Sequence, residues 1–148
     1  MAIPRFATTA IALGAALLGG CGGQTDEARY DVTAQSASID KRDAQGRCWQ
    51  SDCSAPLTYV CAGLFGRRSC STSRTGTAPQ WFEVLLPGID ASALRSGLTV
   101  DYIHGSKTAA DTTICHSNVA LTDLILSAGH FDLPCGGANV VTLGLKAN

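Results

Sequence analysis

The sequence predicts an all-β fold, a small disulfide-stapled antiparallel sandwich or barrel that follows an apolar leader and a disordered linker. Three observations lead to this prediction. Short runs alternate apolar and polar residues with a period of two, clusters of Gly, Pro, Ser and Asn separate these runs, and six cysteines lie in the same stretch of chain.

The strand pattern is clearest in four runs: residues 57–62, 80–86, 98–104 and 140–145. Each run places alternate side chains on opposite faces and is rich in β-branched or aromatic residues, as strands are. Pro87 and Gly88 are expected to end the second run.

Two segments are less regular. Residues 90–97 predict a helical turn, with Asp90 as its N-cap and Gly97 just past its end. Residues 119–126 fit either a helix or a strand, and Thr122 together with the spacing of the leucines favours a strand.

The N-terminus has the layout of an export signal. Residues 1–5 carry one basic side chain, and residues 6–18 form an uncharged apolar run. This run is shorter than the roughly 20 residues that a helix needs to cross a bilayer. We therefore expect a cleaved signal peptide rather than a retained transmembrane helix.

The leader ends in Leu18-Gly19-Gly20-Cys21. This motif resembles the lipobox of bacterial lipoproteins, in which a small residue precedes a cysteine that receives a diacylglyceryl group through its sulfur. The resemblance implies that residues 1–20 are removed and that lipidated Cys21 becomes the first residue of a membrane-anchored cell-envelope protein. The alternative is an ordinary secretory signal cut nearby, which would leave Cys21 as a thiol.

The residue after the lipobox cysteine bears on location. In Gram-negative lipoproteins an Asp at this position favours retention at the inner membrane. Here the residue is Gly22. The resemblance therefore implies the outer membrane, facing the periplasm or the cell surface.

Residues 21–47 lack the features of a folded segment. Charged and small polar residues dominate, large apolar residues are few, and no period is sustained. Such a segment buries too little surface to offset the entropy of ordering it. We therefore expect residues 21–47 to be a flexible linker between the lipid and one domain at residues 48–148.

Six cysteines follow Cys21, and the leader directs them to an oxidising compartment. They predict three disulfides, although the sequence leaves the connectivity open. Our preferred set pairs neighbours along the chain: Cys48 with Cys53, Cys61 with Cys70, and Cys115 with Cys135. The C-x-x-C spacing typical of zinc sites and redox dithiols is absent, so we expect no metal and no cofactor.

The sequence contains no clear catalytic constellation. It has no G-x-S-x-G motif, and His104, His116 and His130 do not have the spacing of a metal site. Paired-carboxylate catalysis would need two acidic side chains to converge in a cleft. The acidic candidates are Glu83, Asp101, Asp111, Asp123 and Asp132. The near-neutral charge of residues 48–148 gives no basic face for a nucleic-acid partner.

Contact residues are the remaining candidates. A bridge from Cys61 to Cys70 would close a loop with Phe65, Arg67 and Arg68 near its tip. An aromatic ring beside two guanidinium groups is typical of a partner-binding surface, and a solvated hairpin end is the alternative.

The strand at residues 80–86 offers a second contact candidate. It has two apolar faces, so either Trp81 or Phe82 is free to lie outward and contact a sugar ring or a protein, and core packing on both faces is the interpretation favoured over this one. We therefore expect a binding or interaction module for a protein or a wall polymer. The alternatives are an envelope enzyme that uses a carboxylate pair or a histidine site, and a purely structural envelope component.

Overall fold

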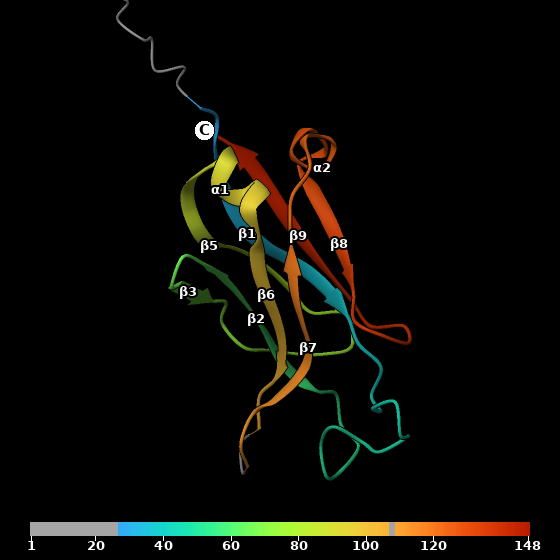
Figure 1. Cartoon of the computed structure of the whole chain (residues 1–148). Coiled ribbons are helices and arrows are strands. Elements are labelled where there is room, and N and C mark those ends of the chain that lie inside the picture. Colours follow the sequence, from blue (N-terminus) through green and yellow to red (C-terminus); the bar gives the residue numbers. More distant parts are fainter. Residues whose placement is uncertain (1–26, 107–108) are drawn as a thin grey trace, which may run out of the picture.

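Two antiparallel sheets pack face to face in the computed structural model, which describes residues 27–106 and 109–148 (Figure 1). The strands are β1 (Arg29–Ser38), β2 (Leu57–Leu64), β3 (Arg67–Cys70), β4 (Arg74–Thr75), β5 (Gln80–Asp90), β6 (Leu98–His104), β7 (Thr112–Val119), β8 (His130–Pro134) and β9 (Val140–Ala147). Two short helices are α1 (Ala91–Ser96) and α2 (Asp123–Ala128). The first sheet has the order β5-β1-β9-β8, and the second has β3-β2-β6-β7 with β4 paired to β2.

The predicted all-β class is confirmed, and so is the preferred disulfide set. The runs at 57–62, 98–104 and 140–145 fall within β2, β6 and β9, and α1 matches the predicted helical turn. The large side chains that are fully buried between the sheets include Tyr102, Leu86, Leu94, Leu98, Leu121 and Leu143. The three disulfides are Cys48–Cys53, Cys61–Cys70 and Cys115–Cys135.

Strand β1 corrects the prediction that residues 21–47 form a flexible linker. It is an inner strand of the first sheet and pairs with β5 on one side and β9 on the other. Its inward side chains Val32 and Ala34 are fully buried but small. Because bulkier residues on β5 and β9 supply the apolar volume, β1 needs little of its own and its sequence shows only a weak strand pattern.

The rest of the predicted linker divides into two parts. Residues 39–47 form a loop with its own backbone hydrogen bonds, including Asp43 N–H to the Arg47 carbonyl at 2.8 Å. The predicted signal peptide at 1–20, Cys21 and the linker as far as residue 26 lie outside the described residues.

Strand β5 continues through Pro87 and Gly88, where the sequence predicted its end. The pairing of β1 with β5 shifts register between Tyr30 and Val32. Gly88 has a φ of 62° and donates its N–H to Oδ1 of Asp31 at 2.8 Å. The two residues thus form a bulge on an edge strand, where proline and a left-handed glycine are both tolerated.

The strand predicted at residues 119–126 is wrong, because α2 occupies most of that segment. Oγ1 of Thr122 accepts the Ile125 N–H as the N-cap, and Gly129 ends the helix in the left-handed conformation. Threonine favours strands as a β-branched residue, but its hydroxyl also caps helices. Here the cap and the glycine decide the outcome.

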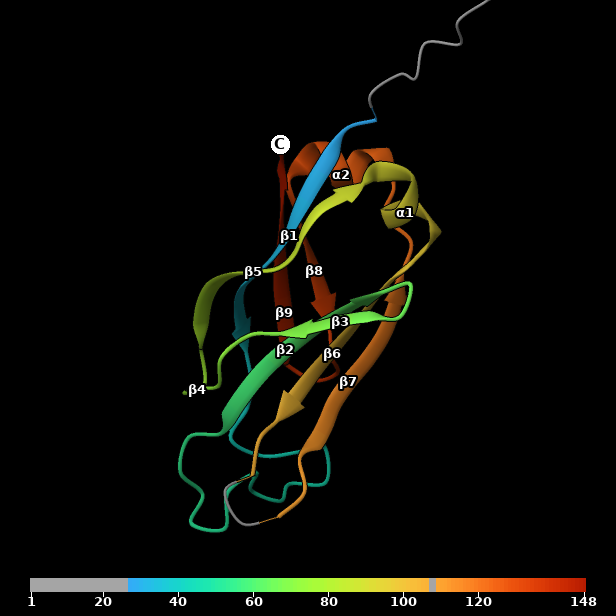
Figure 2. The same cartoon turned by 90° about the vertical axis from the view of Figure 1, so that its left-hand side faces the viewer.

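The two ends of the sandwich differ in content (Figures 1 and 2). The start of β1, the C-terminus and both helices lie at one end, called here the helix end. Loops 39–56 and 135–139 lie at the opposite end, called the loop end. No helix among the described residues is long and apolar enough to span a bilayer.

Candidate functional site

A two-residue turn projects Phe65 into solvent between β2 and β3. Leu64 pairs with Arg67, and the turn residues Phe65 and Gly66 have φ angles of 48° and 77°. Positive φ at both positions is typical of a type I′ hairpin turn, a conformation that suits glycine and is uncommon for phenylalanine. The Phe65 side chain is nevertheless 77% exposed. An aromatic ring thus stands in solvent on a backbone conformation that disfavours it.

The predicted Cys61–Cys70 bridge holds this hairpin. The two cysteines lie opposite each other in the β2–β3 pairing, at the far end of the ladder from Leu64 and Arg67. Strand β2 is also paired with β6 along its other edge. A covalent cross-link and a neighbouring strand therefore restrict the hairpin, so its tip has little freedom to lose on binding.

Two shallow hollows flank the hairpin tip. A largely apolar hollow of about 190 Å³ lies between the tip and the end of β5, and its lining includes Leu64, Leu86, Ile89 and Ala93. Asp90 also lines it, and its carboxylate is paired with Arg29 at 3.0 Å. A second hollow of about 310 Å³ lies along the strands, and its lining includes Gly63, Gly66, Gly97 and Thr99. Phe65 and Arg67 line both. We call Phe65, Arg67, Arg68 and these two hollows the hairpin surface.

The two arginines of the hairpin surface have different surroundings. Arg68 Nη2 donates to Oδ2 of Asp101 at 3.1 Å, and Oδ1 of the same carboxylate accepts from Nδ1 of His116. Among the described residues Arg67 has no ion-pair partner, and it is exposed. Arg67 therefore presents an uncompensated positive charge beside the exposed Phe65 ring.

Trp81, predicted as a contact residue, is part of the core instead. Its side chain is 5% exposed, and its Nε1 donates to the Thr72 carbonyl at 2.7 Å. The ring packs edge-on against Tyr102. Phe82 takes the outward position and is 68% exposed, on a residue with a φ of 54°. Phe82 lies at a local irregularity of β5, because its φ is positive and the pairing with β1 shifts register between Ala34 and Ser36. The bulge turns Phe82 outward while Trp81 stays in the core.

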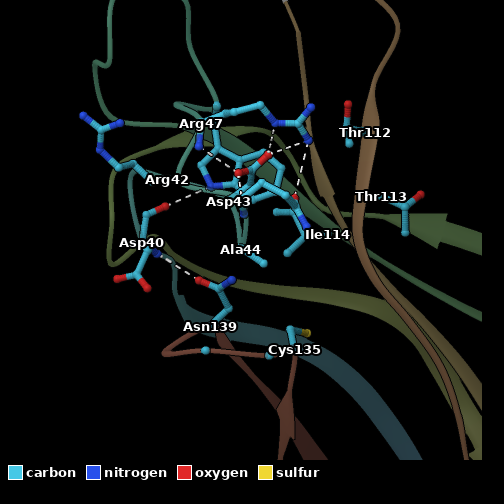
Figure 3. A pocket seen from close by; sticks show the side chains of 14 residues that line it. Asp40, Arg42, Asp43, Ala44, Arg47, Thr112, Thr113, Ile114, Cys135 and Asn139 are labelled. Carbon is cyan, nitrogen blue, oxygen red and sulfur yellow. Dashed lines mark hydrogen bonds and ion pairs between the residues drawn. The ribbon is translucent and has the colours of Figure 1, made fainter.

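A polar pocket of about 340 Å³ opens at the loop end of the sandwich (Figure 3). Three segments far apart in sequence form its walls, namely the loop at 40–49, the start of β7 at 112–114 and the β8–β9 turn at 135–139. We call this the loop-end pocket. The charged residues that line it are Asp40, Arg42, Asp43 and Arg47.

Hydrogen bonds join the walls of the loop-end pocket. The Asp40 N–H donates to Oδ1 of Asn139 at 2.9 Å, and Trp49 Nε1 donates to the Asp40 carbonyl at 3.0 Å. Ser38 Oγ donates to the Ala138 carbonyl at 2.8 Å. Ser38 and Lys41 have the S-x-x-K spacing found in some serine hydrolases. The Ser38 hydroxyl is engaged with the turn, so the spacing here serves the structure.

Asp43 organises the 40–49 loop. Its carboxylate accepts the backbone N–H groups of Gln45 and Arg47, both at 2.9 Å, and the Arg47 guanidinium at 2.8 Å. Partial desolvation acts to raise the pKa of Asp43, but the hydrogen bonds from Arg47 and Gln45 outweigh it and lower the pKa below its ordinary value. Asp43 is thus an ionised structural acceptor and is poorly suited to donate a proton.

The three histidines lie in different surroundings. His104 is 4% exposed, its Nδ1 lies 3.0 Å from the Leu57 carbonyl, and its ring packs against Trp49 at an interplanar angle of 48°. His116 binds Asp101, and His130 contacts the Ala128 carbonyl. Within residues 27–106 and 109–148, no three His, Cys, Asp or Glu side chains are arranged to hold a metal ion.

The candidate carboxylates are likewise engaged in separate interactions. Glu83 accepts from the Thr72 backbone and hydroxyl, and it lies 3.6 Å from Arg74. Asp101 instead binds Arg68 and His116 on the other sheet. The remaining three lie apart as well, with Asp111 bonded to Tyr59, Asp123 to Arg95 and Asp132 to Thr142.

The sequence analysis missed the loop-end pocket because it assigned residues 40–47 to the linker. A signal was present, since Asp43 followed by Gly46 is typical of a type I turn. The adjacent Cys48 also indicated that ordered structure begins nearby. The other walls come from distant segments, and no local pattern in the sequence places them together.

The chain matches no protein-family model and no curated protein. Its fold is similar to that of the C2A domain of a plant extended synaptotagmin 1, with a TM-score of 0.57, 11% identity and coverage of 82% of this chain and 94% of that one. It is also similar to part of human GIVD cytosolic phospholipase A2, with a TM-score of 0.59, 12% identity and 82% of this chain covered. This chain spans only 17% of the phospholipase chain. At such low identity the likeness concerns the β-sandwich fold alone.

Proposed function

We propose that this chain is a cell-envelope lipoprotein, anchored through acyl chains on Cys21, whose β-sandwich is a non-enzymatic module that binds a protein partner through the hairpin surface. The observation that carries the proposal is the combination at the hairpin tip: the Phe65 ring is 77% exposed at a residue with a φ of 48°, and it stands with Arg67 beside an apolar hollow. Phe82 is exposed at a similar φ but lines neither hollow of the hairpin surface. Backbone strain of this kind persists where the surrounding structure enforces it, and it is concentrated at functional positions.

The chemistry of the hairpin surface defines the partner. Aromatic and arginine side chains on a rigid support are the commonest contributors to binding energy at protein interfaces. The hollow beside Phe65 has an apolar lining that accepts an apolar side chain. Arg67 carries a free charge that pairs with a carboxylate. The partner is therefore a protein segment that presents an apolar side chain next to an Asp or a Glu.

The proposed anchor places the module close to the bilayer. Strand β1 begins at Arg29, so a short segment, residues 22–28, separates Cys21 from the sandwich. Fully extended, such a segment spans at most about 25 Å. The helix end of the sandwich, where β1 begins, is consequently the end tethered near the membrane, and the partner is a protein that approaches within about one domain diameter of that surface.

The first experiment tests the hairpin surface with matched variants. Wild-type protein in detergent is cross-linked in envelope extract, the captured protein is identified and purified, and its affinity is measured by calorimetry. Phe65→Ala is expected to weaken binding about 30-fold or more, as for a truncated hot-spot residue. Phe82→Ala is the control, because Phe82 is also an exposed phenylalanine at positive φ. Equal binding by wild type and Phe65→Ala would refute the assignment.

A charge reversal tests the partner's chemistry. Arg67→Glu is expected to abolish binding, and a partner variant in which the facing carboxylate is exchanged for lysine is expected to restore it. Restoration by the second change would exclude general unfolding as the cause. If no exchange of an acidic partner residue for lysine restores binding to Arg67→Glu, Arg67 does not form the proposed ion pair.

The anchor is tested independently of the partner. Mass spectrometry of the mature protein is expected to find a diacylglyceryl group on Cys21 and no residues before it. Cys21→Ser is expected to leave the chain uncleaved or soluble. Gly22→Asp is expected to move the protein to the inner membrane if the host is Gram-negative. An unmodified sulfur on Cys21 would overturn the lipoprotein assignment and leave the hairpin surface unaffected.

A further inference from the structure

We propose that the loop-end pocket is a second binding site, and that it takes a neutral saccharide unit of a polysaccharide. The inference goes beyond the protein partner of the hairpin surface and stands on a different part of the molecule. It rests on four properties of the pocket: its rigid walls, its charge balance, the polar groups that it presents, and its volume and position.

The walls of the pocket are held by covalent bonds and hydrogen bonds. The Cys48–Cys53 disulfide lies beside Trp49 in the first wall. The Cys115–Cys135 disulfide joins the β7 wall at 112–114 to the β8–β9 turn at 135–139. Asn139 links the β8–β9 turn to Asp40 on the opposite wall. A cavity with walls fixed in this way loses little conformational entropy when a ligand enters.

The charges in the pocket cancel. Asp40 and Asp43 carry two negative charges, and Arg42 and Arg47 carry two positive ones. Arg47 is paired with Asp43 at 2.8 Å, and Arg42 Nη1 donates to the Gly46 carbonyl at 2.6 Å. Because each sign of charge is matched within the lining, an anionic or a cationic ligand gains no net electrostatic attraction to offset its lost hydration. A neutral ligand loses less hydration on entry, so the charge balance favours it.

The polar groups suit a ligand that both donates and accepts hydrogen bonds. Asp40 offers acceptors, the arginine N–H groups that are not already engaged offer donors, and the hydroxyls of Thr112 and Thr113 do both. The indole of Trp49 also lines the pocket and offers an apolar surface to the C–H groups of a sugar ring. Sugars combine many hydroxyls with apolar ring faces, so they match this lining better than an apolar ligand does.

The volume and position of the pocket fit a chain of sugars. About 340 Å³ lies at the small end of the range for ligand pockets. It accommodates one or two sugar units, and the opening to solvent lets a longer polymer continue. The loop at 40–49 and the turn at 135–139, which line the pocket, lie at the opposite end of the sandwich from the start of β1 (Figure 1). If Cys21 is anchored, the pocket faces away from the membrane, toward any polymer beyond it.

Tryptophan fluorescence of the full chain in detergent provides the test. The chain has two tryptophans, Trp49 in the pocket and Trp81 in the core. Titration with chitobiose and with cellobiose is expected to change the emission of the wild type, and Trp49→Phe is expected to remove that change. Digalacturonic acid, a charged disaccharide, is expected to bind at least about tenfold more weakly, because its own carboxylates lose hydration in a pocket that has no net positive charge.

Variants then locate the site. Asp40→Asn and Thr112→Val are each expected to weaken saccharide binding about tenfold through loss of one hydrogen-bonding group. Thr142→Val is the matched control, because Thr142 lies on β9 outside the pocket. Phe65→Ala is expected to bind saccharide normally, which separates this inference from the proposed function. No response to any neutral disaccharide at 10 mM, roughly the weakest useful affinity, or an equal loss in Thr142→Val, would overturn the inference.

Discussion

The hairpin surface projects from the sandwich, whereas the loop-end pocket is recessed into it. The projecting side chains of the first, Phe65, Arg67 and Arg68, come from one β-hairpin that a cross-link closes, although residues of β5, α1 and β6 complete its hollows. The second assembles three segments that are far apart in sequence, and one of its cross-links joins β7 of one sheet to the turn that follows β8 of the other. Residues close together in the sequence are sufficient to form a projecting hairpin tip, whereas a pocket lined by distant segments forms only when the whole chain has folded. The two regions should therefore respond differently to the same kinds of change.

Removal of the Cys115–Cys135 bridge should have the largest effect. Cys115→Ala with Cys135→Ala is expected to reduce the free energy of unfolding by about 3 kcal/mol, because the open chain regains loop entropy. Urea unfolding checks this value. Hydrogen exchange should show lost protection at 112–114 and 135–139, while the β2–β3 ladder stays protected. A uniform loss across both regions would mean that they do not behave independently.

Replacement of Phe65 should separate binding from stability. Phe65→Asn is expected to raise the free energy of unfolding by about 1 kcal/mol, because Asn followed by Gly suits the type I′ turn. The same variant should lose the protein partner. Thermal unfolding and calorimetry measure the two effects. A variant that is less stable than wild type would show that the Phe65 ring supports the fold instead of serving binding.

Acid should weaken the loop end. Hydrogen bonds lower the pKa of Asp43, as described above, and the hydrogen bond from Tyr59 lowers that of Asp111. In the unfolded chain both titrate near pH 3.9, roughly the ordinary value. As the pH falls, the two carboxylates therefore take up protons in the unfolded chain before they do so in the folded one. The contribution of Asp43 and Asp111 to stability is present above about pH 4 and is lost as the pH falls through their folded-state pKa values.

The measurement compares the stability of wild type and Asp43→Asn between about pH 6 and pH 2.5, a range that spans the carboxylate titrations. The variant should be less stable at neutral pH and should lose less stability on acidification. The hairpin should keep its amide protection down to a lower pH than residues 40–47. An unchanged pH dependence in the variant would show that Asp43 does not contribute.

Loss of the Arg67 charge should have the smallest effect on the fold. Arg67→Ala is expected to change the free energy of unfolding by less than about 0.5 kcal/mol, because the side chain is exposed. The partner's association rate should fall and lose part of its salt dependence. Stopped-flow binding at two salt concentrations measures this, and a large change in stability would reveal a structural contact of Arg67.

Local patterns predicted those parts of the molecule that depend on local chemistry. Alternation located β2 and β6, and neighbouring cysteines identified the hairpin with Phe65 and Arg67 at its tip. The failures have a shared cause. The small inward residues of β1 resemble a linker until bulkier strands cover them, and Thr122 fits a strand until the following turn uses its hydroxyl as a cap. In each case the deciding contact lies outside the segment.

By itself the sequence determined the all-β class, the number of disulfides and a hairpin between Cys61 and Cys70 if those two cysteines pair, because alternation, spacing and turn chemistry act over a few residues. The connectivity of the disulfides was only a preference at that stage, and the structure decided it. Only the tertiary structure decided that β1 is an inner strand, that Trp81 is buried instead of Phe82, and that loops from three distant segments enclose a pocket. The physical reason is that burial depends on what packs against a side chain, and those neighbours lie far away along the chain.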